Sequence, residues 1–303
     1  MALGVSGEEV VLRHGPHTAA VTQVGATVRE FHTGDRAVLD GFAADEICPA
    51  GHGQPLLPWP NRIGDGRYGF GGDEHQLALN EPERGNAIHG LTRWQPWDIV
   101  ERTEDAVALS TRVYPQPGYP FALELEISYR LDDTGLTVTY GAVNAGTGQL
   151  PFGAGQHPYL SPGPGGVDGA RLRLAVGSVV EVDERLLPTG LGAVPAGLDF
   201  RTARELRGVQ LDTCFGGLER GAGGRFTADL TGADGRTVRL WMDGSWRWCQ
   251  LFSSDPLSGA RHRAALAVEP MTCPPDAFRS GQDVIVLAPG QRFDGAWGVG
   301  LIP

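Results

Sequence analysis

The sequence contains no lysine, so all 25 of its basic residues are arginine. Enzymes that form a Schiff base with a substrate or with pyridoxal phosphate need a lysine amine, and a Walker-type phosphate loop needs a lysine ammonium group. These chemistries are therefore excluded. Because arginine stays charged and is a poor base, any proton transfer must fall on histidine, aspartate, glutamate, tyrosine or cysteine.

Cysteines and long apolar runs are also scarce. Cys48, Cys214, Cys249 and Cys273 are widely spaced and form no CxxC pair, which argues against a zinc ribbon or a dithiol redox site. We expect four free, buried thiols. No apolar run approaches the roughly 20 residues needed to span a bilayer, and the N-terminus lacks the pattern of a signal peptide. The sequence therefore predicts a cytoplasmic protein.

Positive charge is outweighed by negative charge. The 25 basic residues face 36 acidic ones among 303 residues, which gives a net charge of −11. Nucleic acids and anionic lipid surfaces attract basic proteins and repel acidic ones. We therefore expect neither a nucleic acid nor a membrane as a partner.

Helical periodicity is nearly absent, whereas strand patterns recur. Residues 121–131 alternate between apolar and polar side chains, and after the turn at 132–135 a second alternating run covers 136–140; together they predict a β-hairpin. A second hairpin is predicted from 226–230 and 237–241, and a strand over 284–287. A short helix over 201–206 is possible, with Asp199 as its cap.

These patterns predict an all-β fold, a large antiparallel β-sandwich with few short helices. The 45 glycines and 22 prolines are spread along the chain and punctuate short segments, and no repeat or shift in composition marks a boundary. Sandwiches and barrels of this length occur as one domain. We therefore expect a single domain over residues 1–303.

Glu269 stands out among the polar residues. It directly follows the apolar run 264–268 and precedes Pro270, so a carboxylate ends an apolar strand where we expect the chain to turn. A desolvated carboxyl there should have a raised pKa, which suits a base at neutral pH. A glutamate that pairs with an arginine at a strand end explains the segment equally well.

Two histidines lie in glycine-containing segments. His157, in Gly155-Gln-His-Pro-Tyr159, is held extended by Pro158 and projects from a fixed strand end, which suits a proton donor. His89 follows an apolar pair and precedes Gly90; taken alone, such a histidine is more often structural.

Other segments carry side chains suited to a polyhydroxylated ring. The proline-rich loop 55–66 presents Asn61 and Arg62 beside Trp59, and these residue types hydrogen-bond to sugars or stack on them. Asp212 and Gln250 each stand alone among apolar neighbours. Each of these signals is weak by itself.

Taken in order along the chain, the motifs resemble the aldose 1-epimerase (galactose mutarotase) family. The resemblance runs from Gly25-Ala26 to Pro289-Gly290 and depends on several segments that occur together. They are Pro58-Trp-Pro-Asn-Arg-Ile63, Ile88-His-Gly90, Gly155-Gln-His-Pro-Tyr159, Leu187-Pro-Thr-Gly190, Leu211-Asp212, Gln250 and Val268-Glu-Pro-Met-Thr272.

The resemblance implies a galactose mutarotase-like supersandwich that interconverts the anomers of a free hexose such as glucose or galactose. It implies that Glu269 is the general base at the anomeric hydroxyl and that His157 is the acid at the ring oxygen. The substrate-binding residues it implies are Asn61, Arg62, His89, Asp212 and Gln250. No metal and no organic cofactor is implied, and the expected partner is a monosaccharide.

Two alternatives remain open at this point. A hexose 6-phosphate epimerase would need converging arginines, which the segment Arg261-His-Arg263 could supply. A protein that kept the fold and lost turnover would bind sugar without catalysis. The segment 251–255, Leu-Phe-Ser-Ser-Asp, departs from the family pattern and leaves the preferred sugar undetermined.

Overall fold

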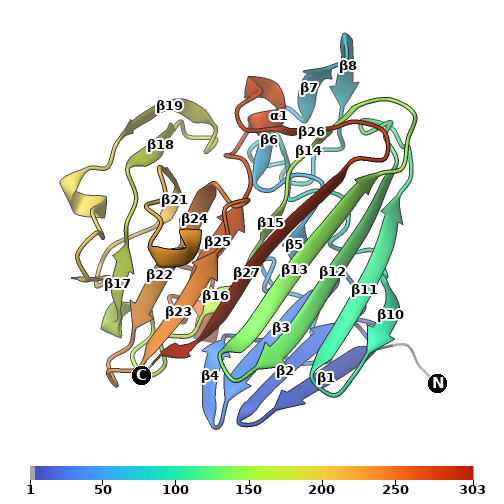
Figure 1. Cartoon of the computed structure of the whole chain (residues 1–303). Coiled ribbons are helices and arrows are strands. Elements are labelled where there is room, and N and C mark those ends of the chain that lie inside the picture. Colours follow the sequence, from blue (N-terminus) through green and yellow to red (C-terminus); the bar gives the residue numbers. More distant parts are fainter. Residues whose placement is uncertain (1–3, 303) are drawn as a thin grey trace.

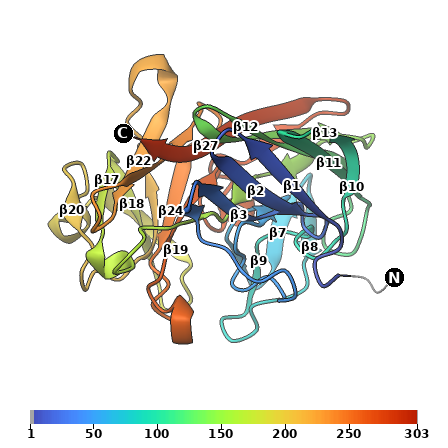
Figure 2. The same ribbon diagram turned by 90° about the horizontal axis from the view of Figure 1, so that it is seen from below.

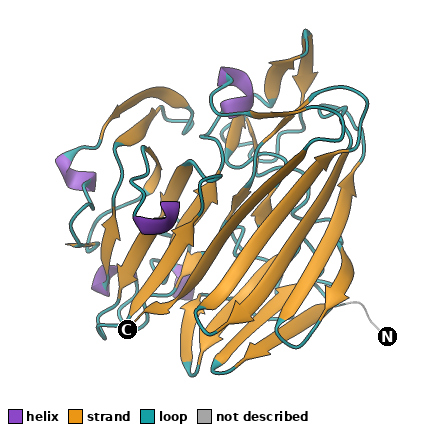
Figure 3. Cartoon of the chain, viewed as in Figure 1, coloured by secondary structure: helices purple, strands orange, loops and turns teal. Residues whose placement is uncertain are grey.

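Antiparallel strands make up most of the structure, a computed structural model that describes residues 4–302 (Figure 3). Within that range the only α-helix is the single turn α1 (Ala277–Ser280). The 3-10 turns are η1 (Val167–Gly169), η2 (Ala196–Leu198), η3 (Ala222–Gly224) and η4 (Gly259–Arg261). The predicted all-β class with few short helices is confirmed.

The larger of the two main sheets has twelve strands, and its β1–β4 edge lies at the bottom of Figure 1. Its strands in spatial order are β1 (Glu9–His14), β2 (His17–Thr22), β3 (Thr27–Thr33), β4 (Arg36–Leu39), β16 (Tyr159–Leu160), β25 (Leu266–Met271), β24 (Trp248–Phe252), β21 (Asp212–Gly216), β18 (Ser178–Val182) and β19 (Pro188–Ala193), with β15 (Gly155–Gln156) and β5 (Pro55–Leu56) attached beside β25.

The second main sheet has nine strands, several of them long, and runs across Figure 1 from β10 and β11 at the right to β22 and β17 at the left. Its order is β10 (Asp98–Arg102), β11 (Ala106–Val113), β12 (Leu123–Asp132), β13 (Gly135–Asn144), β27 (Arg292–Ile302), β23 (Thr237–Met242), β22 (Phe226–Thr231), β17 (Arg171–Leu174) and β20 (Arg204–Glu205). Three small ribbons are β14 (Leu150–Phe152) with β26 (Ile285–Leu287), β6 (Arg62–Gly64) with β9 (Asn86–Ile88), and β7 (Arg67–Phe70) with β8 (Asp73–Gln76).

The strand pairs predicted from alternation are present. β12 and β13 form a hairpin in which Leu131 faces Leu136, and β12 alternates between buried apolar and exposed polar side chains because one face lies on the core. β22 pairs with β23. The suggested helix over 201–206 is wrong. Asp199 instead accepts hydrogen bonds from the backbone and the guanidinium of Arg201, and Arg204–Glu205 form β20.

The two sheets pack face to face around one large cluster of buried apolar side chains. β12 lies against β1 and β2, and Figure 2 shows these strands crossing below the nine-stranded sheet. Hydrogen bonds also join the layers: the Tyr129 hydroxyl donates to the Ala26 carbonyl (2.5 Å), and the Trp297 indole donates to Gln156 Oε1 (3.1 Å). Gln156 directly precedes His157, so the core holds this part of the site in place.

All four cysteines are free and buried, as predicted. Within residues 4–302, no helix is long and apolar enough to cross a membrane. That residues 1–303 form a single domain stays a prediction.

Candidate active site

A cavity of about 410 Å³ opens over the twelve-stranded sheet. A volume in this range suits a small-molecule ligand. The structure brings all seven residues that the sequence singled out into its wall: Asn61, Arg62, His89, His157, Asp212, Gln250 and Glu269.

Three neighbouring strands supply one wall of the cavity. Gln250 on β24 lies opposite Glu269 on β25, and β24 in turn pairs with β21, which begins at Asp212. The Gln250 amide donates to Asp212 Oδ1 (2.6 Å). Because adjacent strands lie about 4.8 Å apart, three polar side chains distant in sequence form one polar row.

The expected turn after Glu269 is wrong, because β25 continues through Pro270 to Met271. Opposite Pro270 the neighbouring ladder is interrupted: Gly155 pairs with Met271 and Tyr159 pairs with Ala267, with no pair between them. Proline has no N–H to donate to a ladder. The facing chain, which carries His157, is therefore free to leave the ladder and project its side chain.

His157 and Glu269 form the centre of the cavity. His157 Nε2 lies 3.4 Å from Glu269 Oε1, and the two residues are 6% and 2% exposed. Within the described residues, His157 Nδ1 and Glu269 Oε2 are buried without a hydrogen-bond partner. Buried polar atoms are nearly always paired, so this pair is suited to a polar ligand.

The short distance limits what the pair can reach. Because the two groups are in contact, both lie on one side of a bound ligand, where they can reach two oxygens bonded to the same carbon.

The environment shifts the two pKa values in opposite directions. Burial raises the pKa of Glu269 well above its ordinary value, and the nearby Asp212 adds to the effect while Arg62 opposes it. Burial lowers the pKa of His157 to about 3, helped by the charges of His52, Arg93 and Arg62. A raised pKa strengthens a carboxylate as a base, and a lowered pKa strengthens an imidazolium as an acid.

The structure does not support the second interpretation of Glu269, a glutamate paired with an arginine at a strand end. Among the described residues no arginine lies within ion-pair distance of its carboxyl, and the side chain in contact with it is His157. That Glu269 acts as a base stays a prediction.

His89 and Asn61 hold each other in an unusual backbone conformation. Both have positive φ, 64° and 55°, and such strained residues cluster at functional sites. The Asn61 N–H donates to His89 Nδ1 (3.2 Å), and the His89 N–H donates to the Asn61 carbonyl (3.0 Å). A neutral imidazole whose Nδ1 accepts carries its proton on Nε2. Burial, with the charges of Arg93, His157 and Arg62, lowers the pKa of His89, so it is a neutral donor.

Arg62 is shared between the cavity and a buried ion pair. Its guanidinium donates three hydrogen bonds to Glu81, 2.9, 3.0 and 3.2 Å long, and its Nη2 lies 3.9 Å from Asp212 Oδ2. Burial tends to raise the pKa of Glu81, but hydrogen bonds from Arg62 and Asn86 outweigh it and lower the pKa. Burial raises the pKa of Asp212, although Arg62 and Arg84 oppose the shift.

Two sequence expectations fail in the structure. Trp59, expected near the sugar-binding loop surface, is buried and packs on Phe278, because the apolar core takes up its large ring. Arg261 pairs with Glu46, and Arg263 pairs with Asp168 and Asp255. Neither arginine lines the cavity, so this segment gives no support to a phosphate site.

Among the lining residues that sequence reasoning missed are Glu81, Arg93 and Tyr159. Tyr159 was visible in the motif around His157, where its ring now stacks on the imidazole at 4.9 Å. Arg93 was visible as a lone charge four residues after His89. Glu81 lies in a polar loop, and only its tertiary pairing with Arg62 reveals it.

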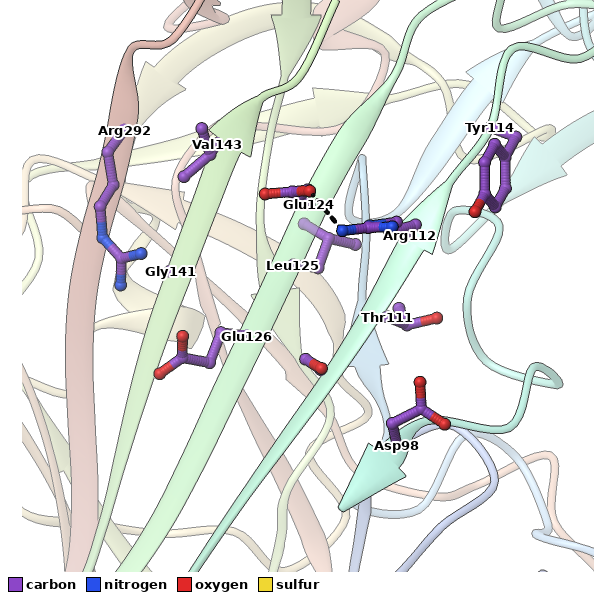
Figure 4. Close-up of a pocket in the computed structure, with 11 residues that line it drawn as sticks. Asp98, Thr111, Arg112, Tyr114, Glu124, Leu125, Glu126, Gly141, Val143 and Arg292 are labelled. Carbon is purple, nitrogen blue, oxygen red and sulfur yellow. Dashed lines mark ion pairs between the residues drawn. The ribbon is translucent and has the colours of Figure 1, made fainter. Parts of the chain in front are cut away.

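A larger hollow of about 540 Å³ lies on the outer face of β11, β12, β13 and β27 (Figure 4). Its charged side chains are exposed, and its two arginines form ion pairs, Arg112 with Glu124 and Arg292 with Asp294. It holds no buried charged or titratable side chain with a free polar atom. The cavity around Glu269 and His157 is therefore the better candidate site.

The fold and this cavity define a galactose mutarotase-like β-sandwich protein. The family model described as aldose 1-epimerase matches residues 8–297, and the chain therefore belongs to the aldose 1-epimerase family. The resemblance seen in the motifs is confirmed.

Individual relatives agree with this assignment. The chain is 35% identical to the uncharacterized protein YihR of Escherichia coli K12 over 94% of this chain and 91% of that protein. It is 34% identical to the galactose mutarotase of Rattus norvegicus, over 46% of this chain and 42% of the relative. Among solved structures, a putative aldose 1-epimerase of Escherichia coli K12 is similar with a TM-score of 0.84 at 23% identity, covering 97% of this chain and 99% of that one.

Proposed function

We propose that this protein is an aldose 1-epimerase that interconverts the α and β anomers of a hexopyranose such as glucose or galactose. The observation that carries the proposal is the contact between the His157 imidazole and the Glu269 carboxyl, 3.4 Å apart in a polar cavity. Mutarotation needs one base and one acid at two oxygens of the same carbon, and this pair offers both.

In the ring-opening step, the Glu269 carboxylate takes the proton from the hydroxyl on C1. The C1–O5 bond breaks as the C1 carbonyl forms, and O5 receives a proton from the protonated His157. The pair thus passes from carboxylate and imidazolium to carboxylic acid and neutral imidazole, and the total number of protons is unchanged. Burial favours the uncharged form of both groups, so it favours this transfer.

Ring closure is the reverse on the other face of the aldehyde. After rotation about the C1–C2 bond, neutral His157 takes the proton from the O5 hydroxyl, O5 attacks C1, and the carboxylic acid of Glu269 returns a proton to the carbonyl oxygen. The same two groups serve both directions, and the enzyme returns to its starting state.

The remaining polar residues of the cavity bind hydroxyl groups in this proposal. His89 donates through its Nε2 proton, because Nδ1 is occupied. Asp212 and Gln250 form a hydrogen-bonded pair that accepts from and donates to neighbouring hydroxyls. Asn61 and Arg62 complete the wall, with Arg62 held in place by Glu81.

The test is polarimetry or NMR exchange with freshly dissolved α-glucose and α-galactose. We expect saturable acceleration by the wild type, and a loss of about 10²–10⁴-fold in kcat for Glu269→Gln and for His157→Asn, the range typical of a missing acid or base. Glu126→Gln on the exposed outer sheet is the matched control and should keep wild-type rates.

Three outcomes would contradict the proposal. Near-wild-type turnover in Glu269→Gln would remove that residue from the mechanism, and a change confined to KM in His157→Asn would reassign it to binding. Sugar binding without any acceleration by the wild type would indicate the second alternative, a non-catalytic sugar-binding protein.

A cytoplasmic location stays a prediction from the sequence.

A further inference from the structure

Arg93 is the charge in the cavity that has no partner. Three arginines line the cavity: Arg62, Arg84 and Arg93. Arg62 and Arg84 both pair with Glu81. No carboxylate lies within 4.0 Å of the Arg93 guanidinium in the described part of the chain, although the residue is only partly exposed. A desolvated guanidinium without an anion is costly, and an anionic ligand would offset that cost.

The groups next to Arg93 supply no negative charge. Burial raises the pKa of the Cys48 thiol to about 12, which keeps it protonated beside Arg93, and the imidazoles of His89 and His157 are neutral or positively charged. The Trp94 ring, 5.8 Å from Arg93 Cζ, offers a weak cation–π contact but no negative charge. The guanidinium therefore remains without a counter-charge of its own.

The backbone of Arg93 is fixed on the histidine side of the cavity. Its carbonyl accepts a hydrogen bond from the Gln54 amide (2.9 Å). A Cβ atom added at Gly51 would lie 3.3 Å from His157 Cδ2 and 3.8 Å from Arg93 Nη1, so the imidazole and the guanidinium border the same backbone position. The Arg93 guanidinium thus lies on the same side of the cavity as the His157 imidazole.

This position selects one part of the sugar. His157 reaches O5 in the proposed function, on which this step rests, and O5 is bonded to C5, the carbon that carries C6. We propose that Arg93 is a specificity-determining residue that binds an oxyanion carried on C6 of the hexose. The planar guanidinium suits two parallel hydrogen bonds to a carboxylate, sulfonate or phosphate, and its position next to the acid would place that group away from the reacting hydroxyl.

The experiment compares anomer exchange rates by NMR for glucose and for glucose derivatives with a 6-carboxylate, a 6-sulfonate or a 6-phosphate. We expect the wild type to use at least one of these anions with a kcat/KM about tenfold or more above glucose. Arg93→Gln should lower kcat/KM for that substrate by about 10- to 100-fold, the range for a hydrogen bond between charged groups, and should lower it for glucose much less, so that the preference for the anion over glucose is lost.

Two further variants make the comparison specific. Arg93→Lys keeps the charge without the fork and should restore part of the preference. Arg102→Gln removes an exposed arginine that pairs with Glu8 far from the cavity wall and should leave every rate unchanged. A wild type that prefers glucose to all three anions, or an Arg93→Gln variant that loses glucose and anion turnover equally, would overturn the inference.

Binding of the same four sugars to Glu269→Gln, measured by calorimetry, separates this inference from the proposed function. Suppose that the wild type turns over none of the sugars, but that an anionic derivative binds tightly and does so only when Arg93 is present. The inference then stands and the epimerase proposal fails. If turnover of glucose is fast and no anion gains affinity through Arg93, the epimerase proposal stands and the inference fails. If neither turnover nor Arg93-dependent binding occurs, both fail.

Discussion

Glu269 is a residue whose proposed catalytic use conflicts with stability. Its carboxyl is buried with one oxygen unpartnered among the described residues, and burial raises its pKa. A raised pKa in the folded state means that folding favours the protonated carboxyl. The free energy of unfolding is therefore lowered at pH values where the Glu269 carboxyl is ionised in the unfolded chain. Such a loss of stability is common at functional sites.

We therefore predict that Glu269→Gln is more stable than the wild type at neutral pH, by about 0.5–2 kcal/mol. The wild-type stability that comes from the raised pKa is present below the ordinary value of 4.5 and is lost as the pH rises toward the folded-state pKa. The difference between the variant and the wild type should therefore grow as the pH rises from 4.5.

Urea unfolding at several pH values checks this prediction. Glu126→Gln, an exposed glutamate on the outer sheet, serves as the control and should show no such growth with pH. A variant less stable than the wild type across the whole range would mean that the Glu269 carboxyl is better solvated than its burial indicates.

At the scale of elements, two kinds of segment bring the site together. Strands β21, β24 and β25 place Asp212, Gln250 and Glu269 side by side. Short non-strand segments place the histidines: His89 directly follows β9 and is held against Asn61, and His157 lies where the ladder opposite Pro270 is interrupted. The alternation of apolar and polar residues predicted single strands and hairpins, but it did not show which strands from separate segments pair with each other.

Gly90 tests how closely the segment that carries His89 must pack against its neighbours. Its φ is +73°, and an added Cβ would lie 2.0 Å from the Leu57 carbonyl oxygen. We predict that Gly90→Ala costs about 2–3 kcal/mol of stability and raises KM, because the loop that carries His89 must move.

Gly71 provides a matched control. It also has a positive φ, +65°, but an added Cβ meets nothing within 4 Å. Gly71→Ala should therefore lower the free energy of unfolding only by the cost of a left-handed backbone conformation, about 1–2 kcal/mol, and leave KM unchanged. Equal effects of the two substitutions in denaturant unfolding and in kinetics would show that the close approach to Leu57 is unimportant.

At the scale of the whole molecule, the core of the sandwich reaches directly to the site. Gln156 Oε1 accepts hydrogen bonds from Tyr140 and Trp297, and its amide donates to the Gly53 carbonyl. Tyr140 and Trp297 belong to the nine-stranded sheet, whereas Gln156 precedes His157 in the other layer. The position of the imidazole thus depends on how the two sheets pack.

We predict that Trp297→Ala destabilises the protein by about 3–5 kcal/mol, because it leaves a cavity where a fully buried indole was. Activity that survives should show a reduced kcat, since Gln156 loses a partner. Trp94→Ala removes a ring that is 56% exposed and should change stability by less than about 0.5 kcal/mol. Thermal unfolding of both variants is the measurement, and similar losses would contradict the prediction.

The sequence by itself determined the fold class and the family. Alternation within each strand reports which face meets the core, so the hairpins at β12–β13 and β22–β23 were predictable. The short polar motifs, including those at Glu269 and His157, were visible because each breaks a local apolar pattern. The helix over 201–206 failed because local capping signals were weaker than the hydrogen bonds that Asp199 and the β20 edge supply.

The tertiary structure alone decided which charges are paired and which are free. Arg62, Arg93, Arg261 and Arg263 are equivalent in the sequence, but partners far away along the chain occupy three of them and leave Arg93 without an anion. The same is true of the separation between Glu269 and His157, which depends on strand register and on the gap opposite Pro270. Ion pairs and distances across a sheet are set by non-local contacts, on which local sequence patterns carry no information.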